Sequence, residues 1–173
     1  SMQVPADALY GAQTARAIQN FQISGQPLPR AFIRSLALLK SACASSNVGL
    51  GLLAPKVGRA IVHAAQTVAA GDLDAQFPID VFQTGSATSS NMNMNEVLAH
   101  LAGQALGQSV HPNDDVNLSQ SSNDVVPSAI HISACLACKE ALLPALLQLK
   151  RSIDRRARGL QKVAKTGRTH LMD

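Results

Sequence analysis

Residues 125–149, VVPSAIHISACLACKEALLPALLQL, form the most apolar stretch of the chain. Most of them are good helix formers, and polar residues suited to capping stand just before them at positions 122–124. The pattern predicts a helix from about residue 123 to residue 165. We expect Pro127 in its first turn and a kink at Pro144.

This helix would be apolar on nearly all sides, so most of its surface should be buried. A membrane-spanning helix is the alternative, and it needs about 20 consecutive apolar residues. Lys139 and Glu140 interrupt the run and His131 lies within it, which favours burial among other helices over a membrane. The remaining residues are too few to surround the helix. Its partners are therefore expected from other chains or from a further C-terminal portion.

Shorter stretches with helical spacing precede the long helix, and they lie at about residues 14–21, 32–48, 55–71 and 93–107. Pro55 suits a helix start, while Gly71 and Gly107 suit helix ends. Asn93, followed three residues later by Glu96, resembles a capping box and predicts a helix start there. Residues 72–90 and 108–120 are expected to be loops.

Composition agrees with this helical pattern. Of the 173 residues, 46% are hydrophobic but only 3% are aromatic, which favours closely packed helices over a sandwich or barrel. We therefore expect an all-α fold in two parts. Residues 1–120 would form a helical domain, and residues 121–173 would begin a central helix bundle.

Charge and cysteine content argue against some classes of partner. The net charge of +4 is concentrated in residues 150–168, without the aromatic residues or motif of a nucleic-acid-binding protein. We assign it to a solvated helix end and expect no nucleic-acid partner. Cys135 and Cys138 form a single C-x-x-C pair, too little for a metal or redox site. With Cys43, they are expected to be buried, reduced thiols of a cytosolic protein.

Three polar segments lie at the predicted helix ends, at residues 84–91, 119–124 and 167–170. Helix N-termini bind anions, because their free N–H groups and positive dipole end point outward. Two such segments could bind the two carboxylates of a small diacid. Helix capping is the alternative explanation for the same Ser, Thr and Asn residues.

A fourth segment contains His111, Pro112, Asn113 and Asp114. Its residues are typical of a turn, and a lone loop histidine needs no function. A metal site would require more ligands than this segment offers. The residues themselves therefore leave turn and binding site open.

Taken together and in order, these blocks resemble the class II fumarases of the fumarase/aspartase superfamily. The resemblance rests on residues 4–14, 85–96, 111–117, 119–124 and 167–171. It implies an all-α lyase that adds water reversibly to fumarate in the tricarboxylic acid cycle, without metal or cofactor. It also implies a cytoplasmic homotetramer whose active sites combine segments from three chains. Aspartate ammonia-lyase, on the same fold, and a non-catalytic helical interaction module are the alternatives.

The resemblance also implies roles for single residues. His170 would act in proton transfer, and His111, Pro112, Asn113 and Asp114 would form a secondary anion site. The substrate-binding residues would be Ser86, Ala87, Thr88, Ser121, Ser122, Asn123 and Thr169.

The chain departs from the family pattern in three ways. Ala87 stands where fumarases usually have Gly, and Gln108 where some have an Arg of the secondary site. The family's later loop, which carries the catalytic Ser, is absent from the 173 residues, so an N-terminal portion is expected. On its own this portion should be inactive and should self-associate through exposed apolar surface.

Helix length predicts how the site is assembled. A helix of about 40 residues spans roughly 60 Å. His170 follows the predicted helix, whereas Ser121, Ser122 and Asn123 precede it. We therefore expect His170 to meet this loop on a neighbouring chain.

Overall fold

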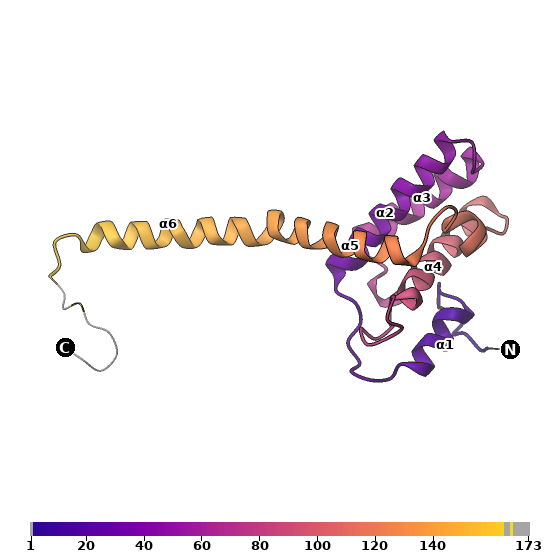
Figure 1. Ribbon diagram of the computed structural model, residues 1–173, viewed down its shortest axis with the longest axis horizontal. Coiled ribbons are helices and arrows are strands. Elements are labelled where there is room, and N and C mark those ends of the chain that lie inside the picture. The colour runs from indigo at the N-terminus through magenta and orange to yellow at the C-terminus, as the bar shows by residue number, and fades with distance from the viewer. Residues whose placement is uncertain (1, 165–166, 168–173) are drawn as a thin grey trace. The chain divides into compact units, whose positions relative to one another are not determined.

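A computed structural model of the chain describes residues 2–164 and residue 167 (Figure 1). In this part of the chain all regular structure is helical, apart from one isolated β-bridge between Pro27 and Asp80. The predicted all-α fold is confirmed. Contacts divide the chain into two compact units, residues 1–134 and 135–173. The expected domain boundary at residue 120 stays a prediction.

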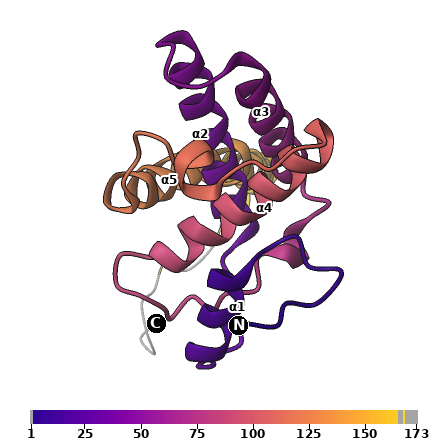
Figure 2. The same cartoon turned by 90° about the vertical axis from the view of Figure 1, so that its right-hand side faces the viewer.

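Three helices form the body of the first unit, and short helices and loops surround them. Helices α2 and α3 lie side by side, and α4 lies against α3 (Figures 1 and 2). The described helices of this unit are α1 (Ala12–Asn20), α2 (Arg30–Gly49), α3 (Pro55–Ala70), η1 (Asp74–Gln76), α4 (Thr88–Leu106), η2 (Pro112–Val116) and most of α5 (Ser122–Ala137).

Local signals set both ends of α3 and the C-terminal end of α4 as predicted. Pro55 is the first residue of α3, and Gly71 ends it with a φ of 112°. Gly107 ends α4 with a φ of 64°. Glycine is favoured at these positive φ angles, because a residue with a Cβ would be strained there.

Small residues let α2 and α3 approach closely. A Cβ on Gly58 of α3 would lie only 2.2 Å from Cγ2 of Val48 on α2. The buried core consists mainly of aliphatic and alanine side chains, with Phe32 and Phe77 among them. Its fully buried members include Leu36, Ile61, Val68, Met94, Val97 and Leu98.

The expected capping box is wrong. α4 begins at Thr88, so Asn93 and Glu96 lie in its interior, and η1 interrupts the loop expected over residues 72–90. The Glu96 carboxylate instead caps α1, accepting hydrogen bonds from the N–H groups of Gly11 (2.9 Å) and Thr14 (3.1 Å) and from the Thr14 hydroxyl (2.6 Å). A negative charge at a helix N-terminus is favourable. Glu96 therefore fastens α1 to α4.

Replacing Glu96 with alanine should lower the free energy of unfolding by about 1–2 kcal/mol, the usual cost of a lost helix cap. Urea titration followed by circular dichroism measures it. Gln104→Ala, at an exposed position of the same helix, is the matched control and should change little. Equal unfolding midpoints for the two variants would show that the Glu96 contacts contribute no net stability.

A second carboxylate holds the loop before α2. Asp80 accepts hydrogen bonds from the N–H groups of Ser24 (2.6 Å), Gly25 (2.8 Å) and Phe82 (2.8 Å). Burial by itself would raise the pKa of Asp80, but these donors and the Ser24 hydroxyl outweigh it and lower the pKa to about 2. The loop that enters α2 is thus fixed by a carboxylate that stays ionised.

The long helix begins and ends close to its predicted limits. Helical residues run without a break over Ser122–Leu160, through α5, η3 (Cys138–Leu142) and α6 (Leu143–Leu160). η3 is a π-helical turn just before Pro144, the residue that was expected to disturb the helix. Pro127, however, is the sixth helical residue and lies beyond the first turn.

In the chain by itself, the apolar side chains of α6 are exposed. Those in the second unit are Leu142, Leu143, Leu146, Leu147, Leu149, Ile153, Leu160 and Val163. The three cysteines are free, as expected. Cys135 and Cys138 are exposed and Cys43 is partly so, which corrects the expected burial. By length and hydropathy alone, Ser122–Leu160 could also cross a membrane.

Candidate functional site

Two polar loops far apart in the sequence meet in the first unit. The first loop, residues 84–91, leads into α4, and the second loop, residues 119–124, leads into α5. The Asn91 side-chain amide donates a hydrogen bond to Oγ of Ser122 (2.9 Å). The first turns of α4 and α5 are therefore in direct contact.

The first loop presents hydroxyl groups at the start of α4. Ser86 and Thr88 are exposed, and their hydroxyls are hydrogen-bonded to each other at 2.7 Å. Between them, Ala87 is the N-cap and has a φ of 50°. Glycine would adopt this left-handed conformation more readily than alanine.

The predicted ligand-binding residues of the second loop have two different roles. Ser121 caps α5, since its hydroxyl accepts a hydrogen bond from the N–H of Asn123 (3.2 Å) and its carbonyl accepts one from the N–H of Asp124 (3.1 Å). The capping interpretation therefore holds for Ser121. Asn123 is exposed, and its side chain has no hydrogen-bond partner in the described part of the chain. It is free to contact a ligand.

A buried cation lies behind the second loop. Lys40 of α2 is fully buried, and its Nζ donates hydrogen bonds to Oδ1 of Asn117 (2.8 Å) and Oε1 of Gln120 (2.9 Å). Burial lowers the pKa of Lys40 to about 7, and the nearby Cys43 thiol opposes this shift. Asn117 Oδ1 also accepts from Asn91 (3.1 Å), so Lys40 belongs to the same hydrogen-bond network as the two loops.

This arrangement suits an anion. Hydroxyls of Ser86, Thr88 and Ser122 and the amide of Asn123 lie in or beside the first turns of two helices. They are neutral donors at positive dipole ends. Such donors stabilise carboxylate charge without forming an ion pair. A catalytic base in the same site would therefore not be neutralised by a nearby cation.

The segment that contains His111 forms a turn, and its polar groups form hydrogen bonds with one another. Nδ1 of His111 accepts a hydrogen bond from the N–H of Asp114 (3.1 Å), and the N–H of His111 donates to Oδ2 of Asp115 (2.7 Å). Nδ1 also lies 3.1 Å from Oδ2 of Asp114. One nitrogen cannot accept from an N–H and donate to a carboxylate at once. We favour the acceptor role, because it closes the η2 turn.

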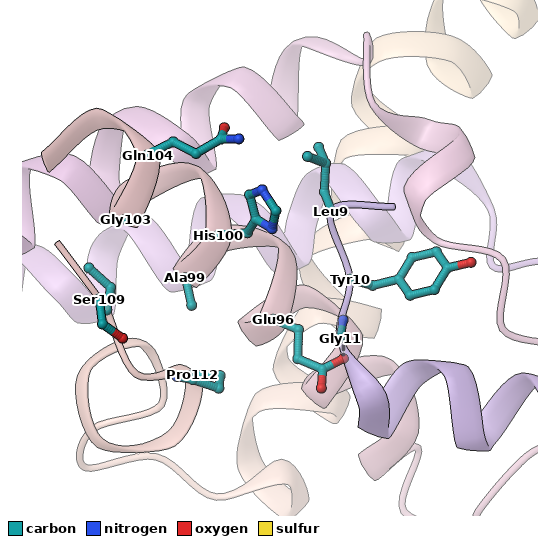
Figure 3. A pocket seen from close by; sticks show the side chains of 11 residues that line it. Leu9, Tyr10, Gly11, Glu96, Ala99, His100, Gly103, Gln104, Ser109 and Pro112 are labelled. Atoms are coloured by element: carbon teal, nitrogen blue, oxygen red, sulfur yellow. Dashed lines mark hydrogen bonds between the residues drawn. The ribbon is translucent and has the colours of Figure 1, made fainter. Parts of the chain in front are cut away.

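A separate cavity lies elsewhere in the first unit. It measures about 410 Å³ and lies between α4 and two chain segments, residues 9–11 and 109–112. Figure 3 shows Glu96, His100 and Gln104 along one face of α4, with Ser109 and Pro112 beside them. Pro112 is the only predicted site residue that lines it. The cavity and the two polar loops are therefore separate.

Thr169 and His170 lie outside the described residues. Among the residues that are described, no three His, Cys, Asp or Glu side chains converge as metal ligands would. The geometry thus places Ser86, Ala87, Thr88, Ser121, Ser122 and Asn123 around one contact between helix ends, with His111 in a separate turn.

A protein-family model described as lyase matches residues 1–173. The chain belongs to this lyase family. Its curated relatives include the class II fumarate hydratase of Xylella fastidiosa, 59% identical over 172 residues. That of Mycobacterium tuberculosis is 57% identical over 172 residues. Both alignments cover 99% of this chain but 36% of the relative, so the chain spans about a third of their length.

Solved structures agree with this lyase assignment. A fumarate lyase:delta crystallin from Brucella melitensis has a TM-score of 0.93 and 42% identity, over 99% of this chain and 40% of that one. A class II fumarase from Schistosoma mansoni has a TM-score of 0.93 and 39% identity, over 98% and 37%. The resemblance predicted from the sequence is confirmed.

Sequence reasoning missed the residues that support this lyase's two loops. Lys40 received no role, and Asn91, Asn117 and Gln120 were only parts of motifs. One signal was present. Lys40 follows Leu36 by four residues and is a lone cation on the apolar face of its helix.

Proposed function

We propose that the whole protein is a class II fumarate hydratase that interconverts fumarate and L-malate. The contact between Asn91 and Ser122 carries this proposal, because it joins the first turns of α4 and α5, where both loops would offer donors to a dicarboxylate. The names of the curated relatives, at 50–59% identity over nearly the whole chain, support the same reaction.

The proposed chemistry follows from the donors. The catalytic Ser that the resemblance implies beyond these residues would accept a proton from the carbon beside a carboxylate of malate, which would leave negative charge on the carboxylate oxygens. Ser122, Asn123 and the helix N-termini would stabilise that charge as it develops. His170 would then manage the departing hydroxide as acid and base, directly or through water. Thr169 would help to bind the substrate.

We also propose a cytoplasmic homotetramer. The row of exposed leucines on α6 supports association, since an apolar face of this size is rarely left in water. The free cysteines are compatible with a reducing compartment. Residues 111–114 stay a predicted secondary anion site, although residues 108–118 contain two carboxylates and no Lys or Arg.

The test is an ultraviolet assay of the whole protein with malate and, separately, with aspartate. We expect fumarate from malate and none from aspartate, with rates that chelators leave unchanged. Fumarate from aspartate alone would identify an ammonia-lyase. No product from either substrate would favour the non-catalytic helical module.

A further inference from the structure

Lys40 is an expensive residue to bury where it lies. Its side chain is 0% exposed, and in the described part of the chain it pairs with no carboxylate. Its partners are the two neutral amide oxygens of Asn117 and Gln120. Burying a cation without a counter-charge is unfavourable, and an apolar side chain would fill the same volume at lower cost. The burial of Lys40 is therefore better explained by the residues that it holds in place than by a contribution to stability.

The loop that contacts Lys40, residues 116–120, forms several hydrogen bonds within itself. Gln120 donates from Nε2 to the carbonyls of Val116 (2.9 Å) and Leu118 (3.2 Å), and Asn117 donates from Nδ2 to the carbonyl of Gln120 (3.1 Å). Both amide groups thus turn their oxygens towards Lys40. Ser119 has a φ of 61°, an angle that non-glycine residues rarely adopt, so this loop conformation is held by its contacts.

Lys40 and a backbone carbonyl together fix the direction of the hydrogen bonds that follow. Asn117 donates from Nδ2 to the carbonyl of Gln120, which can only accept, so its oxygen faces Nζ of Lys40 and accepts from it. Oδ1 of Asn117 can accept a second hydrogen bond only from a donor group. The Asn91 side-chain amide therefore turns its nitrogen towards Asn117. The same nitrogen donates to Oγ of Ser122. Ser122 is therefore an acceptor within the protein, and its own hydrogen is free to point outward.

From this chain of contacts we infer that Lys40 is a positioning residue of the proposed dicarboxylate site. Acting through Asn117 and Asn91, it presents the Ser122 hydroxyl as a hydrogen-bond donor to the substrate carboxylate. The substrate named in this inference rests on the proposed function. The orientation of the second loop by Lys40 does not depend on that function.

The kinetic test uses the whole protein with Lys40→Met, which keeps the unbranched shape and most of the length of the side chain but removes the donor. We expect kcat/KM for malate to fall roughly 10- to 100-fold, the size of a lost hydrogen bond to a charged group, with a raised KM. KM does not depend on the fraction of folded enzyme, so it separates positioning from simple instability. Lys56→Met, at an exposed position of α3, is the control and should leave KM unchanged.

A double variant decides whether Lys40 acts through Ser122. In a Ser122→Ala background, adding Lys40→Met should change KM by less than about twofold, because residues in one network are not additive. If the two effects multiply instead, Lys40 acts by another route and the inference is wrong. An unchanged KM in Lys40→Met would also overturn it.

Amide hydrogen exchange on the whole protein tests the structural part without any measurement of activity. Lys40→Met should speed exchange at least tenfold across residues 117–123 and leave residues 55–70 unchanged. Uniform acceleration across both segments would reduce Lys40 to a general stabiliser and overturn the inference. If Lys40→Met is insoluble, Asn91→Ala replaces it, with the same outcomes expected for residues 120–123. An inactive wild-type protein would count against the hydratase proposal, while this exchange pattern would still decide the role of Lys40.

Discussion

Replacing Asn123 with alanine should lower the turnover of malate by about 10²–10³-fold, the usual effect of removing one oxyanion donor. The side chain is exposed at the start of α5, and it has no hydrogen-bond partner in the described residues. Alanine therefore removes a donor to the substrate and little else. Steady-state kinetics measure the loss, and circular dichroism should show an unchanged helix content.

His111→Asn is the matched control for the anion-binding assignment. His111 lies in the self-capped turn before η2, and its Nδ1 accepts from the N–H of Asp114. Asparagine offers a side-chain oxygen for the same bond, so turnover should change only slightly. A dead His111→Asn enzyme beside an active Asn123→Ala enzyme would mean that the two anion sites are assigned the wrong way round.

Mixing two inactive variants should restore activity. We expect His170→Asn and Asn123→Ala each to inactivate the whole protein, and co-refolded mixtures to regain part of the activity. The reason is the length of the helix between the two positions, which is expected to place them in sites made by different chains. In mixed tetramers, some sites would then carry neither lesion.

Native mass spectrometry should verify that mixed tetramers have formed before activity is compared. Their activity should exceed the sum of the two separate variants. Verified mixed tetramers without recovery would place Asn123 and His170 in one site from one chain. That result would contradict the proposed assembly.

Features that depend on neighbouring residues were predictable from the sequence. Pro55 and Gly71 mark the ends of α3, because each acts on the backbone at its own position. The two polar loops were also located correctly, since Ser, Thr and Asn favour helix starts. Their contact, and the capping role of Ser121 beside the free Asn123, needed the structure.

Features that join distant parts of the chain were not predictable. Glu96 fits a local capping box, yet it caps α1, whose N-cap residue Gly11 lies 85 residues earlier. Lys40 stands out in the sequence only as a lone cation on an apolar helix face, and nothing near it identifies its partner Asn117, 77 residues later. In both cases the partner is brought in by tertiary packing, so one local pattern is compatible with several structures.

Binding of succinate, an unreactive dicarboxylate, tests most directly whether the two loops form one site. Calorimetry on the whole protein should give one succinate per chain and much weaker binding of propionate, which has a single carboxylate. Ser122→Ala in the second loop and Thr88→Ala in the first should each weaken succinate binding about tenfold, as expected for a lost hydrogen bond to a charged group. Succinate affinity that neither substitution changes would contradict a dicarboxylate site shared by the two loops.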